Sequence, residues 1–121
     1  MNVLRRLCGS GRQPNVKIKE LLDQKIKETP VFVISKSYCP FCVKAKNALK
    51  TYNIKPECME VMEIANSPDC DGIQDYMMQL TGGRSVPRVF IGGEFLGGGD
   101  ETVAAHKSGA LPRLLVRAGA L

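Results

Sequence analysis

Two cysteines three positions apart, Cys39 and Cys42, are the residues of this sequence best suited to chemistry. A thiolate, and not a thiol, attacks a disulfide, so an attacking cysteine needs surroundings that stabilise its negative charge. Cys39 precedes Pro40, which suits the first turn of a helix, where unpaired N–H groups and the helix dipole attract an anion. Lys36, three residues earlier, adds a positive charge. These features predict that Cys39 is a nucleophile whose thiolate forms near neutral pH.

Cys42 would follow Cys39 by one helical turn, on the same face of that helix. A thiol in this place can attack a mixed disulfide on Cys39 and release the bound partner. Pro40 stiffens the intervening turn, and Phe41 offers an apolar edge to a small thiol substrate. We therefore expect a redox-active dithiol in which Cys42 is the resolving thiol.

The same Cys-x-x-Cys spacing is half of a zinc site, so metal binding is an alternative. A structural zinc site normally needs a second close pair of ligands. The other cysteines, Cys8, Cys58 and Cys70, form no such pair, and the one histidine, His106, is isolated near the C-terminal end. We expect no metal, and we expect His106 to be a surface residue.

Charge and hydropathy argue against two classes of partner. The net charge of +5 arises ahead of the first acid, because from Glu20 onward twelve Lys or Arg face twelve Asp or Glu. A chain balanced in this way lacks the basic face that binds nucleic acid. No apolar run approaches the roughly 18 residues of a membrane span. We expect one soluble domain over residues 16–121, preceded by a flexible N-terminal tail over residues 1–15.

The cysteine count and the N-terminus bear on the compartment. Five cysteines are an odd number, which does not suit a fully paired secreted framework, and no apolar signal segment occurs near Met1. We expect a reducing compartment, the cytoplasm. The Arg-containing, acid-free start of the chain leaves a mitochondrial location open.

Hydrophobic periodicity and turn residues predict an α/β fold that positions the two thiols. The apolar run 31–34, rich in β-branched residues, suits a buried strand, with Ser35 beginning the following turn. Gly92-Gly93 suits a tight antiparallel hairpin. The expected elements are helices over 16–28, 40 to about 52, 71–80 and 100–108, strands over 31–34, 57–64, 88–91 and 94–96, and a last amphipathic segment over 111–117.

The order of these elements, α-β-α-β-α-β-β-α, predicts a four-stranded mixed sheet flanked by helices. Two strands joined by a helix should be parallel, with a right-handed crossover, and the later hairpin adds an antiparallel pair.

A second group of residues suits the binding of an extended ligand. Pro87 follows Arg84-Ser85-Val86 just ahead of a strand, and a cis proline there would leave the Val86 backbone able to pair with a peptide. Glycines 97–99 permit close backbone approach, and the helix that starts at Asp100 can hold a carboxylate through its N–H groups. We expect both segments to form a groove beside the thiols.

Together, Cys39-Pro40-Phe41-Cys42, Ser85-Val86-Pro87 and Gly97-Gly98-Gly99-Asp100 resemble the dithiol glutaredoxins, thioredoxin-fold enzymes that use glutathione. The resemblance covers roughly residues 16 to 118. It implies that Cys39 is the nucleophile and Cys42 the resolving thiol. It also implies a glutathione site formed by Lys36, Tyr38, Phe41, Gln74, Ser85, Val86, Pro87, Gly98, Gly99, Asp100 and Glu101.

Within that implied site, each end of glutathione has its own residues. Lys36 and Gln74 would surround the glycine carboxylate, and Val86, ahead of a cis Pro87, would pair with the cysteinyl backbone. Gly99 and Asp100 would receive the γ-glutamyl end, Glu101 would face its amino group, and Tyr38 and Phe41 would border the groove. Many relatives have Asp in place of Glu101 and Cys in place of Gly99.

The resemblance implies a glutathione-dependent thiol-disulfide oxidoreductase that reduces protein-glutathione mixed disulfides and protein disulfides. Glutathione would be the reducing co-substrate, regenerated by glutathione reductase, and the protein would act as a monomer. One alternative is an iron-sulfur cluster carrier acting as a glutathione-ligated dimer, against which Pro40 counts. A thioredoxin is another, but the chain has no Trp and lacks the Trp-Cys-Gly-Pro-Cys motif.

Overall fold

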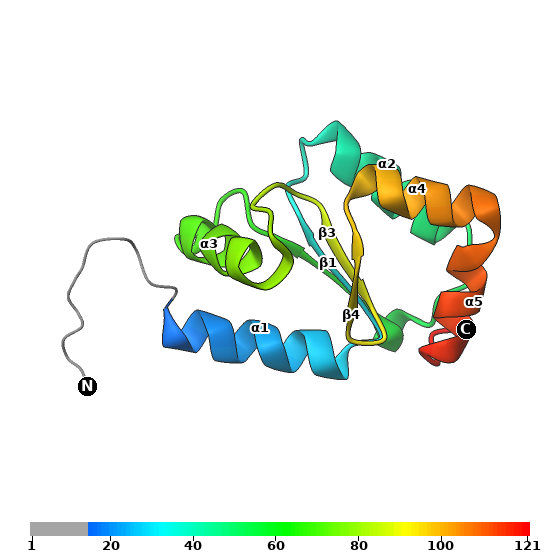
Figure 1. Cartoon of the computed structure of the whole chain (residues 1–121), viewed down its shortest axis with the longest axis horizontal. Coiled ribbons are helices and arrows are strands. Elements are labelled where there is room, and N and C mark those ends of the chain that lie inside the picture. Colours follow the sequence, from blue (N-terminus) through cyan, green and yellow to red (C-terminus); the bar gives the residue numbers. More distant parts are fainter. Residues whose placement is uncertain (1–14) are drawn as a thin grey trace.

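A four-stranded mixed sheet forms the centre of the protein, with helices on both faces (Figure 1). The computed structural model describes residues 15–121. The elements follow the order α1 (Val16–Glu28), β1 (Val31–Ser35), α2 (Pro40–Lys50), a 3-10 turn (Pro56–Cys58), β2 (Met59–Glu63), α3 (Cys70–Thr81), β3 (Arg88–Ile91), β4 (Glu94–Gly97), α4 (Gly99–Ser108) and α5 (Ala110–Arg117). This is the thioredoxin-like architecture that the sequence predicts.

The strand order is β2-β1-β3-β4, so β1 lies inside the sheet. β1 pairs with β2 in parallel, as expected for two strands joined by α2, and with β3 in antiparallel register. Gly92 and Gly93 join β3 to β4 with φ angles of 63° and 84°, which glycine adopts without steric cost. The predicted hairpin and the predicted parallel pair are both confirmed.

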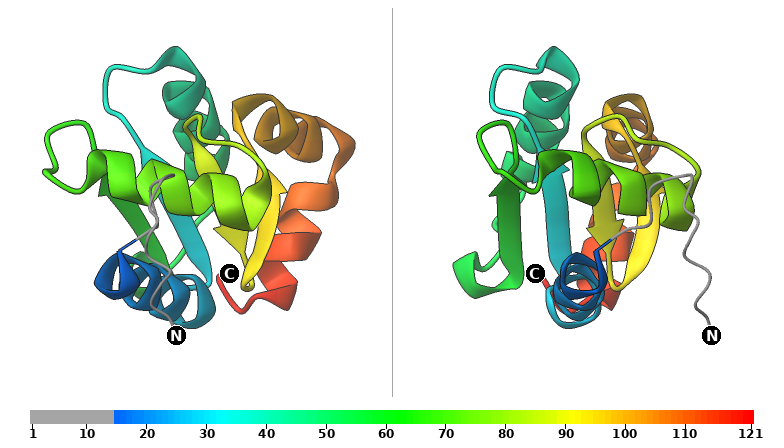
Figure 2. Two further views of the ribbon diagram at one scale, coloured as in Figure 1. Left: turned by 60° about the vertical axis from the view of Figure 1, so that its left-hand side comes forward. Right: turned by 90° about the vertical axis from the view of Figure 1, so that its left-hand side faces the viewer.

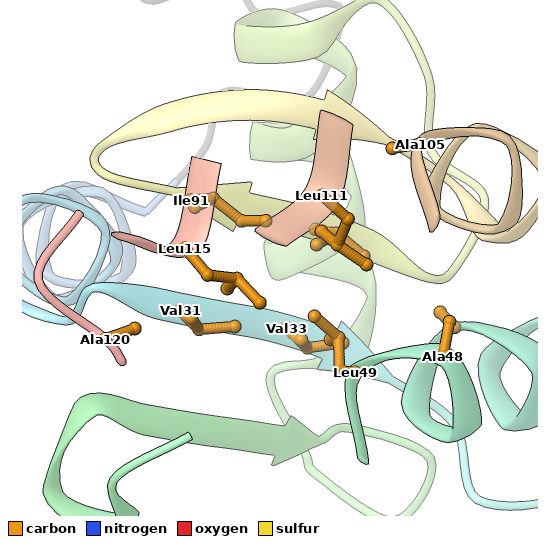
Figure 3. Packing of buried hydrophobic residues seen from close by; sticks show 11 residues of the cluster. Val31, Val33, Ala48, Leu49, Ile91, Ala105, Leu111, Leu115 and Ala120 are labelled. Carbon is orange, nitrogen blue, oxygen red and sulfur yellow. The ribbon is translucent and has the colours of Figure 1, made fainter. Parts of the chain in front are cut away.

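Alternate residues of β1 belong to separate hydrophobic clusters on the two faces of the sheet. Val31 and Val33 belong to a cluster with side chains of α2, α4 and α5, and Figure 3 shows them beside Leu49 and Leu115. Phe32 and Ile34 pack on the other face with α1 and α3. Figure 2 shows the two groups of helices on opposite sides of the strands. Because β1 is buried on both faces, it holds in place the start of the segment that leads to Cys39 and α2.

Three predicted boundaries need correction. Ser35 was expected to begin a turn, but it is the last residue of β1 and is fully buried. The strand expected over 57–64 spans Met59–Glu63, because Pro56–Cys58 forms a 3-10 turn ahead of it. The second helix ends at Lys50, two residues before the expected end. The amphipathic segment expected over 111–117 is present as α5.

Ion pairs link the outer strand β2 to a helix on each face of the sheet. Lys25 of α1 lies 2.7 Å from Glu60, and Lys46 of α2 lies 2.9 Å from Glu63. A further ion pair joins α2 to α4, because the Lys44 ammonium of α2 lies 2.9 Å from the Asp100 carboxylate of α4.

The predicted tail over residues 1–15, including Cys8, lies outside the described residues except for Asn15. The Asn15 side chain accepts hydrogen bonds from two N–H groups in the first turn of α1. In the part of the chain that the structure describes, no helix has the length and apolar character needed to cross a membrane.

Candidate active site

Cys39 occupies the N-cap position of α2, with Pro40 as the first helical residue. Its thiol is half-buried, and its Sγ lies 3.8 Å from the carbonyl oxygen of Val86. Partial burial alone would raise the pKa of Cys39. Hydrogen bonds from the Cys42 backbone and thiol and from the Phe41 backbone, together with the charge of Lys36, nevertheless hold that pKa below its ordinary value. These contacts favour the thiolate of a sulfur that remains partly accessible.

Cys42 lies one turn further along α2 and is fully buried. Its Sγ accepts a hydrogen bond from the Lys36 backbone N–H at 3.4 Å. Burial raises the pKa of Cys42, and the neighbouring Cys39 raises it further, against the opposing effect of the Lys36 N–H and the Ser35 hydroxyl. The two sulfurs thus differ as an attacking and a resolving thiol should. Cys39 is half-buried with a lowered pKa, whereas Cys42 is fully buried with a raised pKa.

The peptide bond between Val86 and Pro87 is cis, as predicted, and Pro87 is buried next to β3. Ser85 ahead of it is exposed and is held by Arg88, whose guanidinium donates to the Ser85 carbonyl at 2.6 Å and to its hydroxyl at 2.7 Å. Because the Val86 carbonyl faces Cys39, the segment with the cis proline borders the reactive sulfur.

The start of α4 forms another border of the site. Gly99 is buried against α2, and a Cβ at that position would lie only 2.6 Å from the backbone oxygen of Phe41. Gly98 is the N-cap of α4, and its N–H donates to the Glu101 carboxylate at 2.7 Å. Asp100 is exposed and paired with Lys44. The close approach of α2 and α4 thus brings this helix start next to the Cys39 end of α2.

The predicted residues around the glycine carboxylate are less exposed. Gln74 is buried on α3, where its amide donates to the Arg84 carbonyl at 2.7 Å and accepts from the Cys70 thiol at 3.4 Å. It therefore contacts the segment that leads to the cis proline. Lys36 is half-buried and acts electrostatically on Cys39.

Two aromatic side chains on either side of Cys39-Pro40 are exposed. Tyr38 is 72% exposed and Phe41 is 49% exposed. The Lys44 ammonium lies 5.1 Å from the centre of the Phe41 ring while it pairs with Asp100, so it connects the Phe41 side chain to the start of α4. Sequence reasoning missed Lys44, because only the packing of α2 on α4 reveals its partner.

Ser35 is the second residue near the thiols that the sequence prediction missed. Its side chain is fully buried, and its hydroxyl has no hydrogen-bond partner among residues 15–121. The alternation of Val31 and Val33 could have revealed it, because in a strand residue 35 shares their face.

Other polar residues take no part in this arrangement. His106, expected at the surface, is half-buried, and its Nδ1 hydrogen-bonds the Tyr52 hydroxyl at 2.6 Å. Within residues 15–121 no three His, Cys, Asp or Glu side chains gather so as to hold a metal ion. A hollow beside Ile26, Phe90 and Phe95 lies near the β3–β4 turn, at the opposite end of β1 from the thiols.

Comparison with known proteins gives consistent matches over this region. The family model "Glutaredoxin" matches residues 31–96. Glutaredoxin-1 of Homo sapiens is 40% identical over 103 residues, covering 85% of this chain and 97% of that protein. The structure of oxidized glutaredoxin 2 from Chlamydomonas reinhardtii is 50% identical, with a TM-score of 0.81 and coverage of 87% of this chain and 96% of that one. A buckwheat glutaredoxin-glutathione complex is 31% identical, with a TM-score of 0.78 and coverage of 89% and 99%.

Proposed function

The chain belongs to the glutaredoxin family, and on that premise we propose that Cys39 is its attacking thiol and Cys42 its resolving thiol. Like the rest of that family, the chain is a glutathione-dependent thiol-disulfide oxidoreductase. The observation that carries the assignment of roles is the contrast between an accessible Cys39 at a helix start and a fully buried Cys42. The family matches favour this activity over that of an iron-sulfur cluster carrier.

In the reaction that we propose, the Cys39 thiolate attacks the glutathione sulfur of a protein-glutathione mixed disulfide. The protein-glutathione S–S bond breaks, the protein leaves as a thiolate with the electron pair, and a Cys39-glutathione disulfide forms. A second glutathione thiolate then attacks the bound glutathione sulfur and displaces Cys39. Glutathione disulfide leaves, and glutathione reductase returns it to glutathione.

For a protein disulfide, the mixed disulfide forms between Cys39 and the protein. Cys42 then attacks Cys39 from the same helical turn and releases the protein thiolate. The burial of Cys42 supports this order of events, because the enclosed thiol meets only the sulfur that Cys39 presents to it.

We propose that glutathione binds along the border formed by the cis-proline segment and the start of α4. The Val86 backbone, which faces Cys39, would pair with the cysteinyl part of the peptide, with Ser85 and Pro87 holding that segment. The N–H groups at the start of α4, at Gly99 and Asp100 after the Gly98 cap, would hold the γ-glutamyl carboxylate. The buckwheat glutaredoxin-glutathione complex supports a glutathione site in a protein of this fold.

The remaining predicted residues would act at the two ends of the peptide. Gln74 uses one amide hydrogen on the Arg84 carbonyl and keeps a second for the glycine carboxylate, near the charge of Lys36. Glu101 would serve the γ-glutamyl amino group while it braces the Gly98 N–H. Tyr38 and Phe41 would cover the groove from the outside.

The partners of this reaction are also part of the proposal. We propose that glutathionylated and disulfide-bonded proteins are the substrates, and that the enzyme acts as a monomer in the cytoplasm. Sedimentation of the purified chain tests the monomer, and subcellular fractionation tests the location.

The assignment of roles is tested with Cys39→Ser and Cys42→Ser variants. Each is assayed on glutathionylated serum albumin with glutathione, glutathione reductase and NADPH. Cys39→Ser should lose the activity, whereas Cys42→Ser should retain it, because the glutathione-dependent steps involve Cys39 alone. Activity that survives in Cys39→Ser would contradict the assignment.

Cys58→Ser is the matched control for a cysteine outside the site. Cys58 is half-buried, and its thiol donates to the Gly119 carbonyl at 3.7 Å, away from α2. This variant should keep full activity. Loss of activity in Cys58→Ser comparable to that in Cys39→Ser would show that cysteine replacement in general, and not the loss of the nucleophile, had been measured.

A further inference from the structure

Ser35 is the last residue of β1, four positions before Cys39, the N-cap of α2. It shares a strand face with Val31 and Val33, which pack against α2 and α5 (Figure 3). The following residue, Lys36, donates its backbone N–H to the Cys42 sulfur at 3.4 Å. The strand face and this hydrogen bond bring Ser35 near Cys42, and the Ser35 hydroxyl is among the groups that act on the pKa of the Cys42 thiol.

The Ser35 hydroxyl is costly in the reduced protein. Its side chain has an exposed fraction of 0%, and among the described residues nothing pairs with its Oγ. A buried polar group without a partner destabilises a fold, so such groups are rare and call for an explanation. An alanine would fill the same place on this strand face without that cost.

In the reduced state this hydroxyl is close enough to Cys42 to lower the pKa of its thiol, but it makes no hydrogen bond of ordinary geometry. The Cys42 thiol directs its hydrogen to the Cys39 thiolate, and the Cys42 sulfur already accepts from the Lys36 N–H. A neutral thiol sulfur is a weak acceptor, so a second donor gains little.

Formation of the mixed disulfide changes the protonation state that Cys42 needs. Once Cys39 is bonded to a partner sulfur, its negative charge is gone and Cys42 must itself become a thiolate in order to attack. A buried thiolate needs hydrogen-bond donors, because burial disfavours the charged form. The Lys36 N–H is one such donor and already bonds to the Cys42 sulfur. The Ser35 hydroxyl is a second donor, which makes no other hydrogen bond among the described residues.

We propose that Ser35 donates a hydrogen bond to the Cys42 thiolate in the mixed disulfide and thereby sets the rate of the resolving step. This inference rests on the proposed role of Cys42 as the resolving thiol. In that step the Cys42 thiolate bonds to the Cys39 sulfur, and the bond from Cys39 to the partner sulfur breaks. The partner leaves with the electron pair and takes up a proton from solvent, to which Cys42 gave its own, while Ser35 keeps its proton throughout.

The charged groups near Cys42 are each engaged with another group, so none of them competes with Ser35 as a donor to the Cys42 thiolate. On its own helix the titrating neighbour is Cys39, and from the preceding loop it is Lys36, whose charge acts on Cys39. β2 contributes Glu63, which is paired with Lys46. α4 contributes Asp100, paired with Lys44, and Glu101, whose carboxylate accepts the Gly98 N–H.

The test is a pH profile of resolution in Ser35→Ala. Full-length protein with Cys8, Cys58 and Cys70 replaced by serine is mixed with 5,5′-dithiobis(2-nitrobenzoate) in a stopped-flow instrument. Attack by Cys39 releases the first thionitrobenzoate, and attack by Cys42 releases the second. The first-order rate constant of the second phase reports the resolving step.

The two profiles are expected to cross. Loss of one hydrogen bond to a charged sulfur should move the half-maximal pH of the second phase up by about one pH unit. Well below that pH the thiolate fraction falls about tenfold, but the more basic thiolate is about threefold more nucleophilic, so the rate falls about threefold to fourfold. At a pH above both midpoints the variant should be about threefold faster. The Tm of the reduced variant should equal or exceed that of the parent, because a buried hydroxyl without a partner has been removed.

Three results would overturn the role of Ser35. An unchanged profile would show that the hydroxyl does not reach the thiolate. A second phase slowed equally at every pH, or a Tm well below that of the parent, would show that Ser35 merely supports the packing of α2. Ser37→Ala, the same change at an exposed residue two positions later, should leave the profile unchanged. Failure of the proposed function is distinguishable, because the parent protein, mixed with one equivalent of the reagent, would then release only one thionitrobenzoate.

Discussion

Replacing Gly99 by alanine is expected to push α2 and α4 apart where the two helices border the active site. The new Cβ would lie 2.6 Å from the Phe41 backbone oxygen and 3.1 Å from the Phe41 Cβ, whereas ordinary contacts begin at 3.4 Å. The difference between 2.6 and 3.4 Å requires a displacement of about 0.8 Å. The obstructing oxygen belongs to the backbone of α2 between the two cysteines, so no side-chain rotation can relieve the contact.

The cost follows from two opposing effects. Overpacking of this kind costs about 1 to 3 kcal/mol, and the change from glycine to alanine in a helix returns about 0.5 to 1 kcal/mol. The free energy of unfolding should therefore fall by about 0.5 to 2 kcal/mol, which lowers Tm by about 2 to 10 °C in a domain of this size. Because the displaced helix start is the proposed γ-glutamyl site, kcat/KM for glutathione should fall about tenfold.

Thermal unfolding followed by circular dichroism, and the deglutathionylation assay at varied glutathione concentration, measure the two effects. Gly72→Ala is the matched control, because its Cβ would lie 2.7 Å from Ile18 Cδ1, the tip of a side chain that can rotate away. That variant should keep its activity and a Tm within a few degrees of the parent. The reasoning is refuted if Gly99→Ala keeps both Tm and kcat/KM, or if Gly72→Ala loses as much stability.

Three further predictions concern charge and capping. Lys36→Met removes a charge that lowers the pKa of Cys39, so the single-turnover rate of Cys39 alkylation should reach half its maximum at higher pH, and an unshifted profile would contradict this. Asn15→Ala removes the oxygen that accepts two N–H groups of α1 and should lower the urea-measured free energy of unfolding by about 1 kcal/mol, whereas Asn15→Asp should not. Burial would raise the pKa of Asp23, but hydrogen bonds from Lys19 and Tyr76 hold that pKa below its ordinary value. The ionised Asp23 therefore stabilises the fold at neutral pH, and this contribution is lost as the pH falls through the lowered pKa. Tyr76→Phe should therefore lose about 1 kcal/mol at neutral pH and converge with the parent near pH 2, and a constant difference would count against the pairing.

Most of the fold could be predicted because its signals are local. The apolar run after Pro30, the hairpin at Gly92-Gly93 and the amphipathic pattern of α1 each specify an element without reference to the rest of the chain. Ser35 could not be placed in this way. A serine after an apolar run suits a turn as well as a strand. The alternation of Val31 and Val33 gives its face only if the strand extends to residue 35, and the packing of α2 over β1 then buries it.

In the candidate site, too, the features set by local sequence could be predicted, whereas those set by tertiary contacts could not. The spacing of Cys39 and Cys42 follows from the helix that begins at Pro40, so their relation could be predicted from local sequence. The partners of Gln74 and Glu101 could not, because each depends on which backbone group the side chain meets in the folded protein. The cis bond at Pro87 was expected from its context ahead of a strand, and it is present.

The ion pairs on β2 have a consequence for the behaviour of the protein at high concentration. β2 is an edge strand, and an edge strand with open N–H and C=O groups is a template on which a second molecule can add a strand and begin an aggregate. Glu60 and Glu63 point to opposite faces of that edge, and each is fixed in place by a lysine of a different helix. An approaching β2 of another molecule would meet fixed charges on both sides, so these two pairs protect the edge from self-association.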